Sequence, residues 1–195
     1  MDLDAGMDRG AWQGTWKAER FPLEEWPDGR ASGIRGLLGS GAGTAESRDG
    51  ALRVTGALAG TPVSWLGFEA SSWSLEAVSG TLLPRPDVAL PEVRLRDVSY
   101  LGVHFDSARA RVRVGDGTAR LEDVVATAGD TVVAVAGDCR WGRAGSTTTL
   151  ERARARSRQF DWLAEGPLEL AGDAEGVTFR RFAARDSAAR IEAAG

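Results

Sequence analysis

Hydrophobic and polar residues alternate along most of this chain with a period of two. The alternation is clearest from Ala108 to Val114, where every second residue is apolar and the residues between are Arg109, Arg111 and Arg113. Successive side chains of a strand point to opposite faces, so this segment would have one apolar and one charged face as a strand. In a helix the same residues would be spread around the circumference. The pattern therefore predicts a β-strand.

The stretch from Val93 to Gly137 contains several such runs, separated by residues typical of turns. Leu101-Gly102, Gly115-Asp116-Gly117 and Gly129-Asp130 lie between the runs. Glycine adopts positive φ without strain and aspartate supports tight turns, which suits short hairpin loops. We expect a meander of four antiparallel strands here. No convincing helix is found in the chain, although residues 161–166 suit one helical turn.

The alternation changes phase at four places, where two residues separate apolar positions instead of one. These places are Leu95–Val98, Phe105–Ala108, Leu121–Val124 and Phe179–Phe182. A phase change moves later side chains to the other face unless a β-bulge absorbs it, and bulges also bend a strand. One interpretation is a row of bulges that curls the sheet into a trough. The other is that the strands break there or that both faces are partly buried.

A degenerate repeat and one proline-rich stretch divide the chain. Residues 119–137 match residues 177–195 in character at a constant offset of 58 residues. Repeats on this scale suggest a modular array in which each unit covers its neighbour. We expect a ragged N-terminus at 1–13, a first β-repeat section at 14–83, a proline-rich connection at 84–91 and a second β-repeat section at 92–195. The chain stops in mid-pattern, so we expect a piece of a larger protein.

Composition narrows the classes of function. The chain has 195 residues, a net charge of −4, one His and one Cys. This mild acidity argues against a dedicated nucleic-acid binder, and a single Cys excludes an intramolecular disulfide framework. No apolar run reaches the length of a membrane-spanning helix, which is about 18 residues.

Candidate chemical sites are sparse. His104 and Asp106 share a strand face, but zinc needs three or four ligands and no other His exists, so a solvated pair is the preferred interpretation. Cys139 has no neighbouring base and is interpreted as a small semi-buried residue. The arginine rows at 109–113 and 152–158 are opposite the apolar face and are interpreted as solvated. No nucleophile–base set or phosphate loop is visible, so we expect a non-catalytic protein without metal or cofactor.

An all-β chain with apolar faces must cover them with a second sheet, by closing into a barrel, or by curling around a guest. We expect the third arrangement, an antiparallel meander of short strands curled into an open groove. A long smooth apolar groove suits acyl chains, since large exposed apolar surfaces usually mark binding sites. The candidate lipid-groove residues are the apolar members of the alternation: Leu52, Val54, Val93, Leu95, Val112, Val114, Leu121, Val133, Val135, Leu168, Leu170 and Phe179.

Several of these strings resemble a known family. Residues 93–98, 105–112, 119–124 and 129–137 are similar to the β-repeat regions of bacterial AsmA-like proteins, most of all the TamB family of translocation and assembly module subunits. The resemblance covers the chain from about Gly14 onward and rests on pattern, without an invariant motif.

The resemblance implies a β-groove (β-taco) protein in the periplasm of a diderm bacterium. Its function would be phospholipid transport between inner and outer membranes, outer-membrane protein assembly and protein secretion. Its partners would be phospholipid acyl chains, an outer-membrane β-barrel assembly protein, and the inner membrane through an anchor that this sequence lacks. The family supplies no catalytic residues. The alternative that the sequence leaves open is a secreted or surface β-sandwich or β-solenoid module for adhesion or carbohydrate binding.

Overall fold

The computed structural model describes residues 2–8, 11–25, 34–65, 68–100, 102–142, 145–172 and 177–193. They form one antiparallel sheet of 14 strands and one turn of 3-10 helix, η1 (Leu23–Glu25). The strands are β1 (Asp2–Asp8), β2 (Ala11–Pro22), β3 (Arg35–Arg48), β4 (Ala51–Trp65), β5 (Phe68–Leu83), β6 (Asp87–Tyr100), β7 (Val103–Gly115), β8 (Thr118–Ala128), β9 (Thr131–Gly142), β10 (Gly145–Arg156), β11 (Asp161–Ala164), β12 (Leu168–Gly172), β13 (Val177–Arg185) and β14 (Arg190–Ala193).

The sheet is a meander in which neighbours along the chain are neighbours in space. From β1 to β10 each strand pairs with the next, while β11 and β12 both pair with β10 and with β13. At the two ends, β1 pairs only with β2 and β14 only with β13, so the sheet does not close into a barrel. The predicted all-β antiparallel meander is confirmed, and β6 to β9 are the four strands expected between Val93 and Gly137.

Several finer expectations are wrong. Residues 161–164 form strand β11 and no helical turn. A sandwich needs two sheets and a solenoid needs parallel coils, whereas the described strands form one antiparallel sheet, so the fold of the alternative module is wrong. The residues on either side of Gly39 and Gly41 belong to one 14-residue strand, β3.

The predicted divisions of the chain fall within this single sheet. Strand β1 lies inside the N-terminal stretch that was expected to be ragged, and it pairs with β2. Residues 84–86 of the proline-rich connection form the turn between β5 and β6, which are hydrogen-bonded neighbours. The division into two β-repeat sections stays a prediction.

Several register shifts in the ladder line up across the sheet, while others, such as those beside Leu38 in β3, lie elsewhere. The aligned shifts occur beside Leu90 in β6, Val112 in β7, Leu121 in β8 and Leu150 in β10. The residues beside these shifts pair with one another from strand to strand, through Leu90–Val112, Val112–Leu121, Leu121–Gly137, Gly137–Leu150 and Leu150–Leu168. We call this row the crease. Bulges bend and twist strands, so an aligned row of them bends the whole sheet.

The four predicted bulges have two outcomes. Those at Leu121–Val124 and Phe179–Phe182 are confirmed by register shifts in the ladders of β8 with β9 and of β12 with β13. At the other two places the register of β6 with β7 continues unshifted, because Leu95 pairs with Ala108 and Val98 with Phe105. The alternation changes in both strands at the same level, and neither strand has an extra residue relative to the other. The predicted bulges at these two places are therefore wrong. Asp97 instead adopts φ 46°, and its carboxylate accepts a hydrogen bond from Ser71 Oγ.

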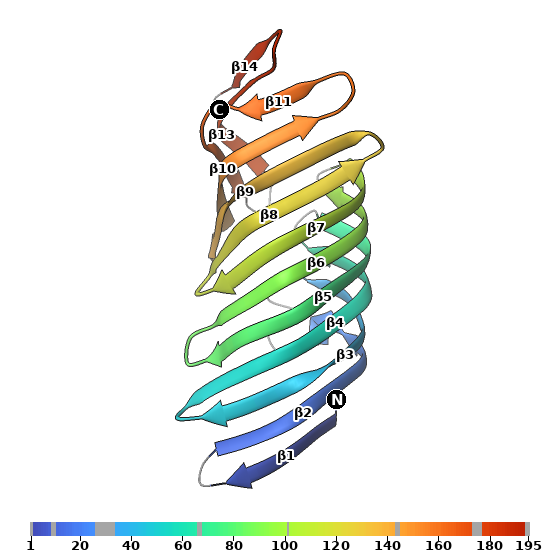
Figure 1. Ribbon diagram of the computed structural model, residues 1–195, viewed down its shortest axis with the longest axis vertical. Coiled ribbons are helices and arrows are strands. Elements are labelled where there is room, and N and C mark those ends of the chain that lie inside the picture. Colours follow the sequence, from blue (N-terminus) through green and yellow to red (C-terminus); the bar gives the residue numbers. More distant parts are fainter. Residues whose placement is uncertain are drawn as a thin grey trace.

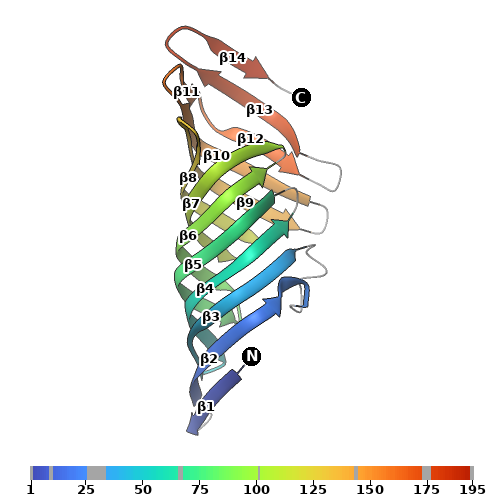
Figure 2. The same ribbon diagram turned by 90° about the vertical axis from the view of Figure 1, so that its right-hand side faces the viewer.

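The strands bend in mid-length, so that the sheet has a convex and a concave face. At the right of Figure 1 the strands turn away from the viewer and continue behind, and Figure 2 shows the same bend from the side. Few side chains are buried in the described residues, and none of the large ones is fully buried. The accessible surface is 12806 Å² for 20.7 kDa, whereas a compact monomer of that mass exposes about 8,900 Å².

Candidate functional site

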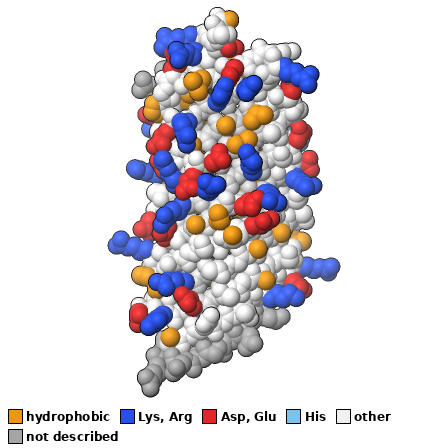
Figure 3. Space-filling view, viewed as in Figure 1, with side chains coloured by type: hydrophobic (Ala, Val, Ile, Leu, Met, Phe, Trp, Pro, Cys, Tyr) orange, Lys and Arg blue, Asp and Glu red, His pale blue; other side chains and the backbone are white. Residues whose placement is uncertain are grey.

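The strand ladder assigns residues to the two faces of the sheet, because directly paired residues of neighbouring strands share a face. One continuous row runs from Val54 through Gly80, Val88, Val114 and Ala119 on five successive strands. The pairings extend this row to a whole face across the described strands. No residue on this face that has a ladder partner is Asp, Glu, Lys or Arg. This uncharged face is the concave one, because Figure 3, which views the convex side, shows acidic and basic side chains spread over the part that is not grey.

All twelve candidate residues of the sequence analysis lie on the concave face by register. Eleven have described side chains: Leu168 is 7% exposed and the other ten are half-buried. Phe179 pairs with Leu170 in the ladder, and its side chain lies outside the described residues. Half-burial of these residues is what an open concave surface produces, since a sheet packed against a second layer buries such residues almost completely.

Tryptophans form a large part of this face, which the sequence analysis missed. All five with described side chains fall on it by register: Trp12, Trp16, Trp73, Trp141 and Trp162. They are far apart in the sequence and not at regular intervals. In the sequence, only the position of each tryptophan within the local alternation could have indicated which face it shares.

Two of these rings lie against glycines of strand β4. A Cβ built on Gly56 would be 2.5 Å from Cζ2 of Trp16, and one on Gly60 would be 2.6 Å from Cε2 of Trp73. Glycine at these positions leaves room for a flat indole directly on the backbone. Trp73 Nε1 is buried without a hydrogen-bond partner, which places this nitrogen within the apolar floor.

A few apolar side chains of the described residues are buried. Val78 is 9% exposed beside the crease, and Leu168 lies on it. A second group contains Leu38, Ala70 and Val98, close to the bend at Asp97. Ala18, Ala45 and Ala184 are buried as well, so buried positions occur along most of the concave face.

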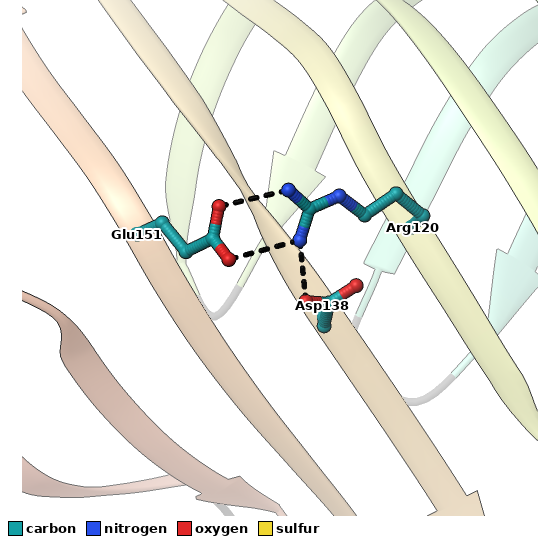
Figure 4. A network of polar contacts seen from close by, with 3 residues as sticks. All are labelled: Arg120, Asp138 and Glu151. Atoms are coloured by element: carbon teal, nitrogen blue, oxygen red, sulfur yellow. Dashed lines mark hydrogen bonds and ion pairs between the residues drawn. The ribbon is translucent and has the colours of Figure 1, made fainter.

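The convex face is held by ion pairs that cross from strand to strand. Arg120 of β8 donates to Glu151 of β10 at 2.8 and 3.0 Å and also to Asp138 of β9, as Figure 4 shows. Glu151 lies at the bulge of β10, between Leu150 and Arg152 in the shifted register. The bulge thus supplies the carboxylate that joins three strands. Arg113 and Asp87 form a similar pair between β7 and β6.

These pairs shift the pKa values of their members. Hydrogen bonding and then the charge of Arg120 lower the pKa of Glu151, and the hydrogen bond from Arg113 lowers the pKa of Asp87. The pKa of Arg120 is raised, first by its hydrogen bond to Glu151 and then by that to Asp138. All of these groups are exposed, so they stabilise the sheet only modestly.

Tyr100 and Cys139 are polar groups on the concave face. Tyr100 belongs to β6 and pairs with Phe68, whereas Cys139 belongs to β9 and pairs with Ala119. Partial burial and then the charge of the Cys139 thiolate raise the pKa of the Tyr100 phenol. The two residues come from strands that are not neighbours in the sheet.

His104 and Asp106, the remaining candidate residues, do not form part of a metal site in the described residues. Asp106 accepts a hydrogen bond from the Gly129 backbone amide at 2.7 Å, and His104 is exposed. Among the residues that the structure describes, no three His, Cys, Asp or Glu side chains lie close enough to hold a metal ion. Across the same residues, no helix has the length and apolar character needed to cross a membrane.

Comparison with models of known protein families gave no match, and neither curated proteins nor solved structures gave a similar protein.

Proposed function

We propose that the concave face is an open hydrophobic groove that holds the acyl chains of phospholipids. The observation that carries this proposal is the continuity of the face: it runs across all the strands of the meander and has no charged residue in the ladder. Exposed apolar surface on this scale is rare in proteins without a binding partner for it. An acyl chain is a flexible, uncharged guest that matches a long surface without polar anchors.

The energetics favour such a guest over a compact ligand. Each methylene fully removed from water contributes about 0.8 kcal/mol, so even half-covered chains of about 16 carbons gain several kcal/mol. Ten of the eleven described candidate residues are half-buried, so their apolar surface is still available. The headgroup would remain in water at the open side of the groove, where no specific recognition is required.

The cellular setting follows from the family resemblance and stays part of the proposal. As a non-enzymatic segment of an AsmA/TamB-like protein, the chain would lie in the periplasm, with an inner-membrane anchor elsewhere in the full-length protein. It would carry phospholipids between the membranes, or serve outer-membrane protein assembly and secretion together with a β-barrel assembly protein. No nucleic acid and no cofactor take part.

The test uses the tryptophans on the groove floor as reporters. Phospholipids that carry a spin-label quencher on the acyl chain should quench the fluorescence of the purified chain, and unlabelled phospholipid should compete. Mass spectrometry of the protein as purified should show co-purifying phospholipid. Quenching that a soluble headgroup analogue competes away, or binding to glycans in place of lipid, would reject the proposal.

A further inference from the structure

The concave face carries a group of polar side chains near the turn between β9 and β10. Cys139 pairs directly with Thr148, and Trp141 pairs with Ser146 in the next row of the ladder. We call these four residues the polar patch. The other hydroxyl residues that the described ladder assigns to this face each pair only with hydrophobic residues: Ser47, Tyr100 and Thr131.

The hydroxyls of the polar patch are open to a guest. Ser146 and Thr148 are half-buried, and neither hydroxyl has a hydrogen-bond partner among the residues that the structure describes. Neither oxygen is fully enclosed, because Trp73 Nε1 is the one buried side-chain nitrogen or oxygen without a partner in this part of the chain. Trp141 is 38% exposed, so its ring lies where the groove meets water. Each hydroxyl can therefore donate a hydrogen bond to a molecule in the groove.

Apolar residues border the polar patch on its inner side. Thr148 pairs with Leu170 of β12. The next row inward is the pair of Gly137 with Leu150, which lies on the crease. Strand β10 extends about 13 Å from Ser146 to Leu150. Over this short length the face changes from polar to apolar, as a phospholipid does between its glycerol esters and its acyl chains.

The uncharged donors select the part of a lipid that they suit. The patch contains no cationic side chain, so it lacks the group that holds a phosphate most strongly. Ester carbonyl oxygens are neutral acceptors, and they lie where the acyl chains join the glycerol. Hydroxyl donors match such acceptors, and tryptophan is enriched at the boundary between hydrocarbon and water.

We propose that the polar patch binds the ester carbonyls of a phospholipid. The hydroxyls of Ser146 and Thr148 donate to the carbonyl oxygens, the acyl chains run inward to the crease, and the phosphate remains in water beyond Trp141. The inference rests on the proposed function, because it locates one part of the same lipid in the same groove.

Lipids with and without ester carbonyls test this site. Diacyl phosphatidylcholine and its dialkyl ether analogue of equal chain length, presented in the same mixed micelles, should compete with spin-labelled phospholipid for the wild-type chain. The diacyl lipid should compete about three- to tenfold better, the size expected for about one net hydrogen bond. In the double variant Ser146→Ala and Thr148→Val this advantage should disappear, while the affinity for the ether lipid stays unchanged.

Thr147→Val is the matched control, since Thr147 is exposed on the opposite face of the same strand and pairs with Arg140. It should preserve the preference for the ester lipid. Equal affinities of the wild-type chain for the two lipids, or a preference that survives in the double variant, would overturn this site and leave the proposed function intact. An equal loss of both lipids in the double variant would also overturn it. If neither lipid displaces the label or quenches the wild-type chain, the proposed function fails as well.

The position of the spin label along the acyl chain tests the orientation. Trp141 should be quenched more by a label near the carboxyl end of the chain than by one near the methyl end. Trp141→Phe should therefore remove more of the quenching by the first label than by the second. Equal or opposite losses would overturn the proposed direction of the acyl chains.

Discussion

The concave and convex faces of this sheet consist of the same strands but differ in residue type and in side-chain contacts. The concave face has uncharged, mostly apolar residues in the ladder, two indole rings lying on glycines, and half-buried side chains on β2 to β13. The convex face has arginines and carboxylates that pair across strands, as in the network of Arg120, Asp138 and Glu151. One face therefore lacks charged ladder residues in the described strands, while the other carries ion pairs that cross from strand to strand.

The bulges connect the two faces. An extra residue in one strand lengthens it locally, and a bent sheet needs its greater length on the convex side. At the bulge of β10 the additional residue is Glu151, whose side chain bonds on the convex face. A phase slip in the sequence therefore encodes both the bend and the position of a charged group, without disturbing the apolar face.

The largest expected effect comes from crowding the concave side of the bend. A Cβ on Gly43 would lie 1.9 Å from the Thr55 carbonyl oxygen, a backbone atom that cannot move aside. Gly43→Ala should lower the free energy of unfolding by about 3 kcal/mol, the upper range for overpacking. Gly142→Ala is the control, since a Cβ there meets nothing within 4 Å. Urea unfolding followed by circular dichroism measures both, and equal stabilities would contradict the close approach of β3 and β4.

A charge on the concave face should have the next largest effect. Val135→Glu replaces a half-buried groove residue, and we expect a loss of about 2 kcal/mol in stability and about tenfold in affinity for the spin-labelled phospholipid. Ala134→Glu, the neighbouring position on the convex side of β9, should change stability by less than about 0.5 kcal/mol and leave lipid quenching unchanged. Similar loss of quenching in both variants would show that the two faces do not differ in lipid binding.

A smaller effect is expected at the bend around Asp97. Ser71 Oγ donates a 2.7 Å hydrogen bond to the Asp97 carboxylate, which accompanies a backbone with positive φ. Ser71→Ala should cost about 1 kcal/mol, the usual value for a hydrogen bond. Ser79→Ala, exposed on the same strand, should be neutral in the same urea titration. A neutral Ser71→Ala would mean that this bond does not stabilise the bend.

The smallest effect concerns the ion pairs of the convex face and depends on pH. The folded-state pKa of Glu151 lies below its ordinary value of 4.5, so its contribution to stability is complete above pH 4.5 and is lost as pH falls through the lowered pKa. Glu151→Gln should reduce the unfolding temperature slightly at pH 7, and the difference from the wild type should vanish in acid.

Glu169→Gln removes an exposed carboxylate that has no ion pair in the described residues, and it serves as the control. It should leave the unfolding temperature nearly unchanged at pH 7. A difference between Glu151→Gln and the wild type that persists unchanged in acid would contradict a role for the charged pair with Arg120.

Local pattern was enough to predict much of this fold. The alternation between Ala108 and Val114 is strand β7, and the glycine and aspartate turns delimit β6 to β9. The repeat with an offset of 58 residues corresponds to two hairpins, β8–β9 and β13–β14, each with a register shift in its first strand. These features depend on neighbouring residues alone, which is why the sequence reveals them.

Other features were missed because they depend on residues that are distant in the sequence. Gly41 lies against the ring of Trp16 and Gly43 against the backbone of β4, and both belong to the long strand β3. Asp161 starts a strand because the edge of β10 is available to it. The gathering of five tryptophans on one face could not be found without the register.

The sequence by itself determined that the chain forms two-faced strands, where most of them turn, and which side chains share a face within each strand, because these properties follow from backbone geometry and alternation. Only the tertiary structure decided that the bulges align into one crease, that the charged side is convex and that the apolar side stays uncovered. Those outcomes depend on the register between strands, and register is set by pairing across the whole sheet.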